Sequence, residues 1–202
     1  MESRAMHEYY DRRAEEYDDW YEGTGLHAAR DRPGWDDELA QLAGTVAALP
    51  PARVLDVACG TGFLTRHLKG EVVGLDQSAS MLAVARERVR AATFVESDAL
   101  TLPFADGAFD RVFTGHFYGH LSRAERERFR AEVARIATEL VVVDSALRDE
   151  VDAEEWQERV LKDGSRHRVY KRYFTGEGLA EELGGGTVLL AGRWFVVVRS
   201  TR

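Results

Sequence analysis

The chain has 202 residues, of which 45% are hydrophobic, 31% charged and 10% aromatic, a composition that excludes disordered, collagen-like and low-complexity proteins. One cysteine cannot form an intrachain disulfide, and no stretch approaches the ~20 apolar residues of a membrane span. A net charge of −8 disfavours a nucleic-acid partner, so we expect a single cytoplasmic domain, without a signal peptide, that acts on a small molecule as a monomer or homodimer.

The first quarter of the chain precedes the first strand pattern. Its opening segment carries five aromatic residues among many charges: Tyr9, Tyr10, Tyr17, Trp20 and Tyr21. A glycine-containing loop follows at 22–34. The next segment places Leu39, Leu42, Val46 and Leu49 on one helical face before Pro50-Pro51 ends the helix. We interpret residues 1–50 as a helical cap that forms one wall of a binding cleft.

Short apolar runs alternate with helical patterns through the middle of the chain. Five of these runs predict strands: Arg53–Val57, Glu71–Leu75, Thr93–Val95, Asp110–Thr114 and Glu139–Asp144. Two intervening segments have one apolar helical face: Met81, Leu82, Ala85 and Val89, then Phe129, Val133 and Ile136. Buried strands that alternate with amphipathic helices predict a doubly wound, Rossmann-like α/β fold with a mostly parallel sheet.

The C-terminal part breaks this alternation. Gly186–Ala191 and Trp194–Ser200 read as strands separated only by Gly192-Arg193, and two residues can join antiparallel strands but not parallel ones. We therefore predict seven strands, the last one antiparallel. Residues 51–145 would form a cofactor-binding core, 146–185 a polar insertion on the substrate side, and 186–202 the C-terminal hairpin.

The first strand runs into a turn of small residues. Asp56 lies in the strand, Ala58, Gly60 and Gly62 follow, and a helix is expected to begin at Phe63-Leu64. Ligands of doubly wound sheets bind beside such a turn, and small residues let a ligand approach the backbone. Asp76 ends the second strand, where a carboxylate can accept hydrogen bonds from both hydroxyls of a ribose.

A dinucleotide fits this turn less well. The third glycine of a Gly-x-Gly-x-x-Gly pattern would fall on Thr65, and Asp56 would repel a pyrophosphate. The same carboxylate suits an ammonium group. A cofactor with a ribose and an amino-acid tail is therefore favoured, and a nicotinamide-dependent oxidoreductase remains a rival interpretation.

Several motifs together resemble a known family. Val54–Gly62, Asp76 and Asp98-Ala99 look like the signature of class I S-adenosylmethionine (SAM)-dependent methyltransferases, and Leu102-Pro103-Phe104 before Phe109-Asp110 resembles the small-molecule group of ubiquinone and menaquinone biosynthesis enzymes. The resemblance spans about residues 53–145. Ala58 stands where the family often has glycine.

The resemblance implies a set of cofactor-binding residues: Tyr17, Asp56, Ala58, Gly60, Gly62, Asp76, Gln77, Met81, Asp98, Ala99, Thr114 and Gly115. In that set Asp56 would hold the methionine ammonium, Asp76 the ribose hydroxyls and Asp98 the adenine amino group. Thr114 and Gly115 would lie under the sulfonium, and Tyr17 would close over the cofactor. The reaction would leave S-adenosylhomocysteine (SAH).

Two histidines follow the fourth strand and are the candidate catalytic residues. Methyl transfer mainly needs proximity and orientation, and an oxygen nucleophile also needs a base, for which a histidine is suited near neutral pH. His116 is the stronger candidate for that base. His120 belongs to a His-Leu pair that resembles one found in relatives with diverse substrates, which favours a structural or cofactor-facing role.

Four residues are candidates for binding the acceptor: Tyr21, Tyr118, Arg168 and Arg172. The two arginines belong to a basic run in an acidic chain, which indicates either a solvated face or recognition of an anionic substrate. No His/Cys/Asp/Glu cluster has metal-ligand spacing, so no metal is expected. We predict transfer of the methyl group to a small molecule, to oxygen in preference to nitrogen or carbon. A non-catalytic SAM-binding protein is the alternative.

Overall fold

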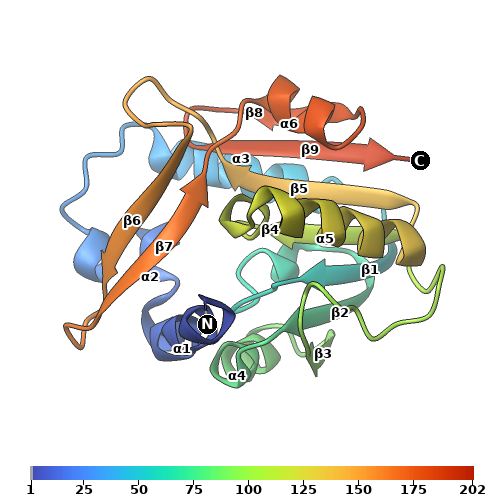
Figure 1. Ribbon diagram of the computed structural model, residues 1–202, viewed down its shortest axis with the longest axis horizontal. Coiled ribbons are helices and arrows are strands. Elements are labelled where there is room, and N and C mark those ends of the chain that lie inside the picture. The colour runs from blue at the N-terminus through green and yellow to red at the C-terminus, as the bar shows by residue number, and fades with distance from the viewer. Residues whose placement is uncertain (1) are drawn as a thin grey trace.

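The computed structural model describes the backbone of residues 2–202 and the side chains of residues 8–202, and it contains nine strands and six α-helices over that range (Figure 1). The strands are β1 (Ala52–Val57), β2 (Gly70–Asp76), β3 (Thr93–Glu96), β4 (Arg111–Gly115), β5 (Glu139–Ser145), β6 (Glu154–Val160), β7 (Arg166–Arg172), β8 (Thr187–Ala191) and β9 (Phe195–Thr201). The helices are α1 (Glu2–Arg13), α2 (Asp19–Glu22), α3 (Trp35–Ala47), α4 (Ala79–Arg88), α5 (Arg123–Ile136) and α6 (Gly176–Glu182). Short 3₁₀ turns lie at η1 (Ala14–Glu16), η2 (Gly25–His27), η3 (Thr65–His67) and η4 (Tyr118–His120).

Seven strands form the central sheet in the order β3-β2-β1-β4-β5-β9-β8. Strands β1 to β5 run parallel to one another, and β9 pairs antiparallel with both β5 and β8. The predicted fold class, a mostly parallel doubly wound sheet with a C-terminal antiparallel hairpin, is confirmed. The strand order reverses between β1 and β4, and ligands of such folds bind in the crevice at that point.

The sheet is covered on both faces by different helices, as buried parallel strands require. On one face Leu55 and Val112 pack with Phe129 of α5 and Leu179 of α6. On the other face Val54, Phe113 and Val141 pack with Leu42 and Val46 of α3. The side chains of neighbouring residues in one strand thus pack on opposite faces of the sheet. This packing on both faces holds the strand ends in fixed positions.

The segment between β1 and β2 differs from the prediction. The helix expected to begin at Phe63-Leu64 is absent, and only the 3₁₀ turn η3 forms there. Twelve residues, 58–69, join the two strands, which is too short for a glycine turn, several helical turns and a return to the sheet. Phe63 and Leu64 are instead buried against the α3 layer. The turn after β8 also has three residues, Gly192 to Trp194, rather than two.

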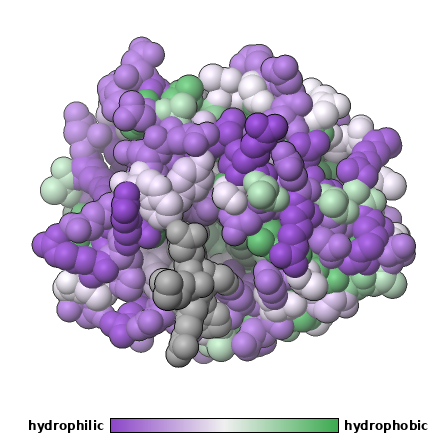
Figure 2. Space-filling view, in the orientation of Figure 1, coloured by the Kyte–Doolittle hydropathy of each residue, from purple (hydrophilic) through white to green (hydrophobic). Residues whose placement is uncertain are grey.

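The polar segment before the last hairpin folds into a ribbon of its own. Strands β6 and β7 pair antiparallel from Glu154↔Arg172 to Val160↔Arg166 and form a second, two-stranded sheet. In Figure 1 this ribbon stands beside the central sheet, with α1 and α2 near its lower end. The surface in Figure 2 is mostly hydrophilic, with apolar residues in small separate areas.

Candidate active site

The turn after β1 is fastened to the end of β2. The backbone N–H of Gly60 donates to Asp76 Oδ2 at 2.9 Å, and the N–H of Ser78 donates to Asp76 Oδ1 at 2.9 Å. Gly60 has a φ of +54°, and a Cβ added there would meet the Tyr17 ring at 3.7 Å. Asp76 therefore has a fixed orientation at the carboxyl end of its strand, beside a turn that keeps its backbone accessible.

Among the residues that the structure describes, two non-glycine residues adopt left-handed backbone conformations, Ala58 with φ 56° and His116 with φ 57°. Each follows a strand that borders the strand-order reversal, Ala58 after β1 and His116 after β4. Such conformations cost about 1–3 kcal/mol and persist only where the surrounding structure imposes them. The N–H of His116 donates to the Val143 carbonyl oxygen at 2.8 Å, which holds this turn against β5.

A cavity of about 530 Å³ opens at these strand ends. Its size is that of a typical small-molecule site. Most residues expected to bind the cofactor line it: Tyr17, Ala58, Gly60, Asp76, Gln77, Met81, Asp98, Ala99 and Gly115. The carboxylate of Asp76, the small residues of the turn and the more distant Asp98 thus lie along one cavity, an arrangement that fits a nucleoside joined to an amino-acid tail. We call it the first cavity.

Three other expected cofactor residues do not line this cavity. Asp56 is 2% exposed and accepts a hydrogen bond from the Thr65 hydroxyl at 2.6 Å, and burial raises its pKa to about 7. Thr114 donates to the Val57 carbonyl oxygen at 2.8 Å. A Cβ on Gly62 would meet Val89 and Ala85 at about 3.3–3.4 Å, so this glycine allows close packing of α4. These residues support the turn from behind.

The segment after α1 closes over the glycine turn through Asp18. The Thr61 hydroxyl donates to Asp18 Oδ1 at 2.6 Å, and Arg88 forms an ion pair with the same carboxylate. Arg88 also donates to the Thr61 carbonyl oxygen at 2.9 Å. One residue away, Tyr17 lies over the turn. The N-terminal cap expected from the aromatic segment is thereby positioned against the cofactor side of the sheet.

A second cavity of about 700 Å³ adjoins the first. Six residues line both: Tyr9, Tyr10, Tyr17, His116, His120 and Trp156. They come from the N-terminal segment, the turn after β4 and the β6–β7 ribbon. A ligand in the first cavity would therefore meet a ligand in the second one among tyrosines and histidines.

Both histidines at this junction are held as neutral rings. His116 is 8% exposed, packs its ring edge-on to Trp20 at 4.9 Å between ring centroids, and burial lowers its pKa to about 3. His120 donates from Nδ1 to the Tyr170 carbonyl oxygen at 2.7 Å, and burial lowers its pKa well below the usual range. His116 Nε2 has no hydrogen-bond partner among the described residues. Rings with such low basicity can accept a hydrogen bond but retain a proton poorly.

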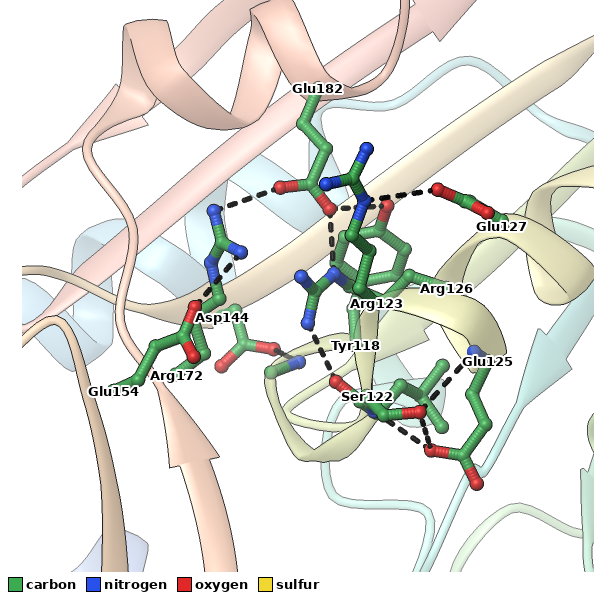
Figure 3. Close-up of polar contacts among 12 residues, drawn as sticks. Tyr118, Ser122, Arg123, Glu125, Arg126, Glu127, Asp144, Glu154, Arg172 and Glu182 are labelled. Carbon is green, nitrogen blue, oxygen red and sulfur yellow. Dashed lines mark hydrogen bonds and ion pairs between the residues drawn. The ribbon is translucent and has the colours of Figure 1, made fainter.

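Three of the four residues expected to bind the acceptor lie outside both cavities. Tyr21 is stacked on Phe63 with ring centroids 3.9 Å apart. Tyr118 is fully buried and donates its hydroxyl to Glu182, which also pairs with Arg172 (Figure 3). We therefore withdraw Tyr21, Tyr118 and Arg172 from the set proposed to touch the acceptor. Arg168 lines the first cavity, with its guanidinium 4.9 Å from the centre of the Trp156 ring.

Sequence reasoning missed the charged residues of the second cavity. Arg159 of β6 and Lys171 of β7 both line it, whereas the sequence favoured Arg168 and Arg172 of the same insertion. One signal could have found the ribbon: Asp163-Gly164 lies between two segments with alternating polarity, a strong hairpin pattern. The structure shows the corresponding turn, with the N–H of Leu161 donating to the Ser165 carbonyl oxygen.

Over the described part of the chain, no group of three or more His, Cys, Asp or Glu side chains could hold a metal ion. None of the described helices is both long and apolar enough to cross a membrane.

Comparison with known proteins finds relatives of the central part of the chain. Residues 54–139 match the family described as a methyltransferase domain. A demethylmenaquinone methyltransferase of Thermus thermophilus is 43% identical over 95 residues, which are 43% of this chain and 42% of that protein. A malonyl-[acyl-carrier protein] O-methyltransferase of Legionella pneumophila is 38% identical over 90 residues, 39% of this chain and 32% of that protein. The match spans less than half the length of these curated relatives.

Solved structures extend the similarity to nearly the whole chain. A DhpI–SAH complex is 27% identical, with a TM-score of 0.75 over 97% of this chain and 94% of that one. The [4+2]-cyclase SpnF shares the fold at 24% identity, with a TM-score of 0.63 over 91% of this chain. The fold is thus that of SAM-dependent methyltransferases, and the same fold carries a different chemistry elsewhere.

Proposed function

We propose that this protein, whose residues 54–139 form a methyltransferase domain of the class I, SAM-dependent kind, transfers the methyl group of SAM to an oxygen atom of a small molecule. The observation that carries the proposal is the junction of the two cavities. The first has the carboxylates and small residues suited to a nucleoside with an amino-acid tail, and the second is a separate space that ends at the same six side chains.

Seven residues of the first cavity would hold the cofactor: Ala58, Gly60, Asp76, Gln77, Met81, Asp98 and Ala99. Asp76 already accepts two backbone hydrogen bonds, which fix its carboxylate for the ribose hydroxyls. Asp98 accepts from the N–H of Leu100 at 2.8 Å and would take the adenine amino group. When bound, SAM supplies a methyl group on a positively charged sulfur, which leaves as the neutral thioether of SAH.

The chain would contribute orientation and exclusion of water more than proton transfer. Tyr9, Tyr10 and Tyr17 form the wall between the cavities, and burial raises the pKa of Tyr17 to about 12, so its hydroxyl stays protonated. His116 and His120 face the same junction as neutral rings. We assign them to hydrogen bonding and packing around the acceptor, because holding two reactants in line is the main requirement of this displacement.

Calorimetric titration with SAH and with NADH tests the cofactor. Both ligands contain adenosine, so the contrast reports on the tail. We expect SAH alone to bind, and Asp76→Ala to weaken it about 10–100-fold, the loss of one or two hydrogen bonds to a charged group. Asp106→Ala is the matched control, since that carboxylate is 81% exposed and pairs with Arg135. Binding of NADH alone would replace this proposal with the oxidoreductase interpretation.

A second experiment separates an enzyme from a non-catalytic SAM-binding protein. SAM is incubated with the protein and a panel of small hydroxylated and acidic acceptors, and SAH release is measured. Release that depends on one acceptor class supports the proposal. Binding of SAH without release on any acceptor would support the non-catalytic alternative.

We propose further that the chain is divided into four parts. Residues 1–50 would act as the cap, 51–145 as the cofactor-binding core, 146–185 as the substrate-side insertion and 186–202 as the closing hairpin. The protein would act in the cytoplasm, as a monomer or homodimer, on a small molecule and not on nucleic acid.

A further inference from the structure

More cationic side chains than carboxylates line the second cavity. Arg13 of α1, Arg159 of β6 and Lys171 of β7 line it from three separate elements. Lys171 is neutralised by Asp144, with 2.5 Å between Nζ and Oδ1. Among the described residues, neither Arg13 nor Arg159 has a carboxylate within 4 Å. Arg30 and Arg32 also line this cavity and have no carboxylate within 4 Å among the described residues, so four cationic side chains face it without an ion-pair partner.

The contacts that Arg13 and Arg159 do make hold them in place without neutralising them. Arg159 donates to Gln157 Oε1 from Nη2 at 2.9 Å and to the Tyr9 hydroxyl from Nη1 at 3.4 Å. Arg13 is 8% exposed, and its guanidinium lies 4.7 Å from the centre of the Tyr17 ring. Tyr9 and Tyr17 line both cavities, so both guanidinium groups lie beside the junction.

The carboxylates of the second cavity have other partners. Glu16 accepts from the N–H of Lys162 at 3.1 Å, and Asp19 pairs with the Lys162 ammonium at 2.6 Å. Glu155 accepts from the Tyr173 hydroxyl at 2.9 Å, and Glu158 pairs with Arg166. Asp19 and Glu158 are thus neutralised, whereas Glu16 and Glu155 accept from neutral donors, and the four unpaired arginines outnumber these two carboxylates. Arg13 and Arg159 lie beside the junction, and guanidinium groups are the donors that proteins use for carboxylate and phosphate groups.

We propose, on the basis of the methyltransferase function proposed above, that the methyl acceptor carries an oxyanion, a carboxylate or a phosphoryl group, which Arg159 and Arg13 bind in the second cavity. His116 Nε2, which has no partner among the described residues, faces the same junction and adds one neutral hydrogen-bonding group. We thus assign to Arg159 and Arg13 the anion-recognition role expected for Arg172, and Arg168, which lines the first cavity, stays a candidate. Arg172 is already paired with Glu154 and Glu182.

The test uses anions as probes in calorimetric titrations of the SAH-saturated protein and of the protein without SAH. Inorganic phosphate and benzoate represent the two oxyanions, and benzamide is the neutral analogue of benzoate. We expect at least one of the two anions to bind, benzamide to bind much more weakly, and Arg159→Gln to weaken the anion about tenfold or more. The anion that binds more tightly identifies whether the acceptor carries a phosphoryl group or a carboxylate.

Arg53→Gln is the control, because Arg53 pairs with the exposed Asp110 and neither residue lines a cavity. The affinity for SAH should stay within about twofold in Arg159→Gln, which shows that the variant is folded. If neither anion binds to the wild-type protein, or Arg159→Gln leaves anion binding unchanged, the proposal is overturned. If anions bind while SAH does not, the methyltransferase proposal fails and the anion site stands.

Discussion

Lys171 of β7 and Asp144 of β5 form an ion pair in which the lysine side chain is 4% exposed and the aspartate side chain is fully buried. Asp144 also accepts from the N–H of Gly119 at 2.7 Å and of Ser145 at 2.8 Å. The pair joins the β6–β7 ribbon to the central sheet directly behind the second cavity. Its satisfied hydrogen bonds are what make a buried pair of charges tolerable.

Removing one partner of this pair should be costly. We expect Asp144→Asn to lower the free energy of unfolding by about 3–5 kcal/mol, because it leaves the Lys171 ammonium buried without a counter-charge. The double variant Asp144→Asn/Lys171→Met should recover part of that loss. Urea denaturation measures both. Arg166→Ala, which breaks an exposed ion pair on the same ribbon, should lower the free energy of unfolding by less than about 1 kcal/mol. An equal loss in Asp144→Asn and Arg166→Ala would mean that the buried ion pair contributes no more than an exposed one.

Asp56 gives the stability a distinct pH dependence. Burial raises its pKa to about 7 in the folded protein, whereas the unfolded chain releases this proton near pH 4. Between these values the folded state holds the extra proton. The contribution of Asp56 to the free energy of unfolding should therefore fall as pH rises from 4 to 7, by up to about 1.4 kcal/mol per pH unit, and stay level above 7.

Asp56→Asn tests this slope, since the amide cannot titrate and keeps a group that can accept from Thr65. Urea denaturation of both proteins at pH 5 and pH 8 gives the difference. We expect wild type to lose more stability than the variant between these two pH values. Identical losses would show that Asp56 is already ionised at pH 5.

His116 should remain neutral throughout the physiological range. Burial lowers its pKa to about 3, so no protonation is expected between pH 8 and pH 5. NMR spectra of the histidine rings can follow this, with His116→Asn identifying the resonance; asparagine tolerates the left-handed backbone at this position. A resonance that shifts near pH 6.5 would contradict the expected neutrality and return His116 to the role of general base.

Asp18 should control access to the cofactor. Asp18→Ala removes the Arg88 ion pair and the Thr61 hydrogen bond, so Tyr17 would no longer be held over the glycine turn. We expect a several-fold loss of SAH affinity in calorimetry and faster amide exchange in residues 14–22. Asp19→Ala is the control on the next residue, because Asp19 pairs with Lys162 of the ribbon. Equal losses in the two variants would mean that Asp18 has no specific role.

The strand ends were predictable from the sequence, because apolar runs mark where each strand ends and the parallel topology brings those ends to one edge of the sheet. Asp76 and Gly60 come from different strand ends, and the parallel order alone brings them to one edge. The helix expected after Gly62 was wrong, because the pattern of Phe63 and Leu64 does not reveal that the connection is too short.

Side-chain direction in the ribbon was beyond prediction from composition. Lys171 and Arg172 are neighbours in one strand, so they point to opposite faces. Lys171 faces the second cavity, and Arg172 faces Glu154 and Glu182. A basic run indicates that charge is present, and only the pairing register determines which arginine reaches a ligand.

The wall of six side chains shared by the two cavities has a consequence for inhibition. A single molecule that links an adenosine to an acidic group through a short spacer would occupy both cavities at once, because the two cavities adjoin at these six side chains. Once one end is bound, the other end is present at a high effective concentration, so the linked compound should bind about 10²–10⁴-fold more tightly than either half. The spacer length that gives the tightest binding then measures the distance over which the methyl group is transferred.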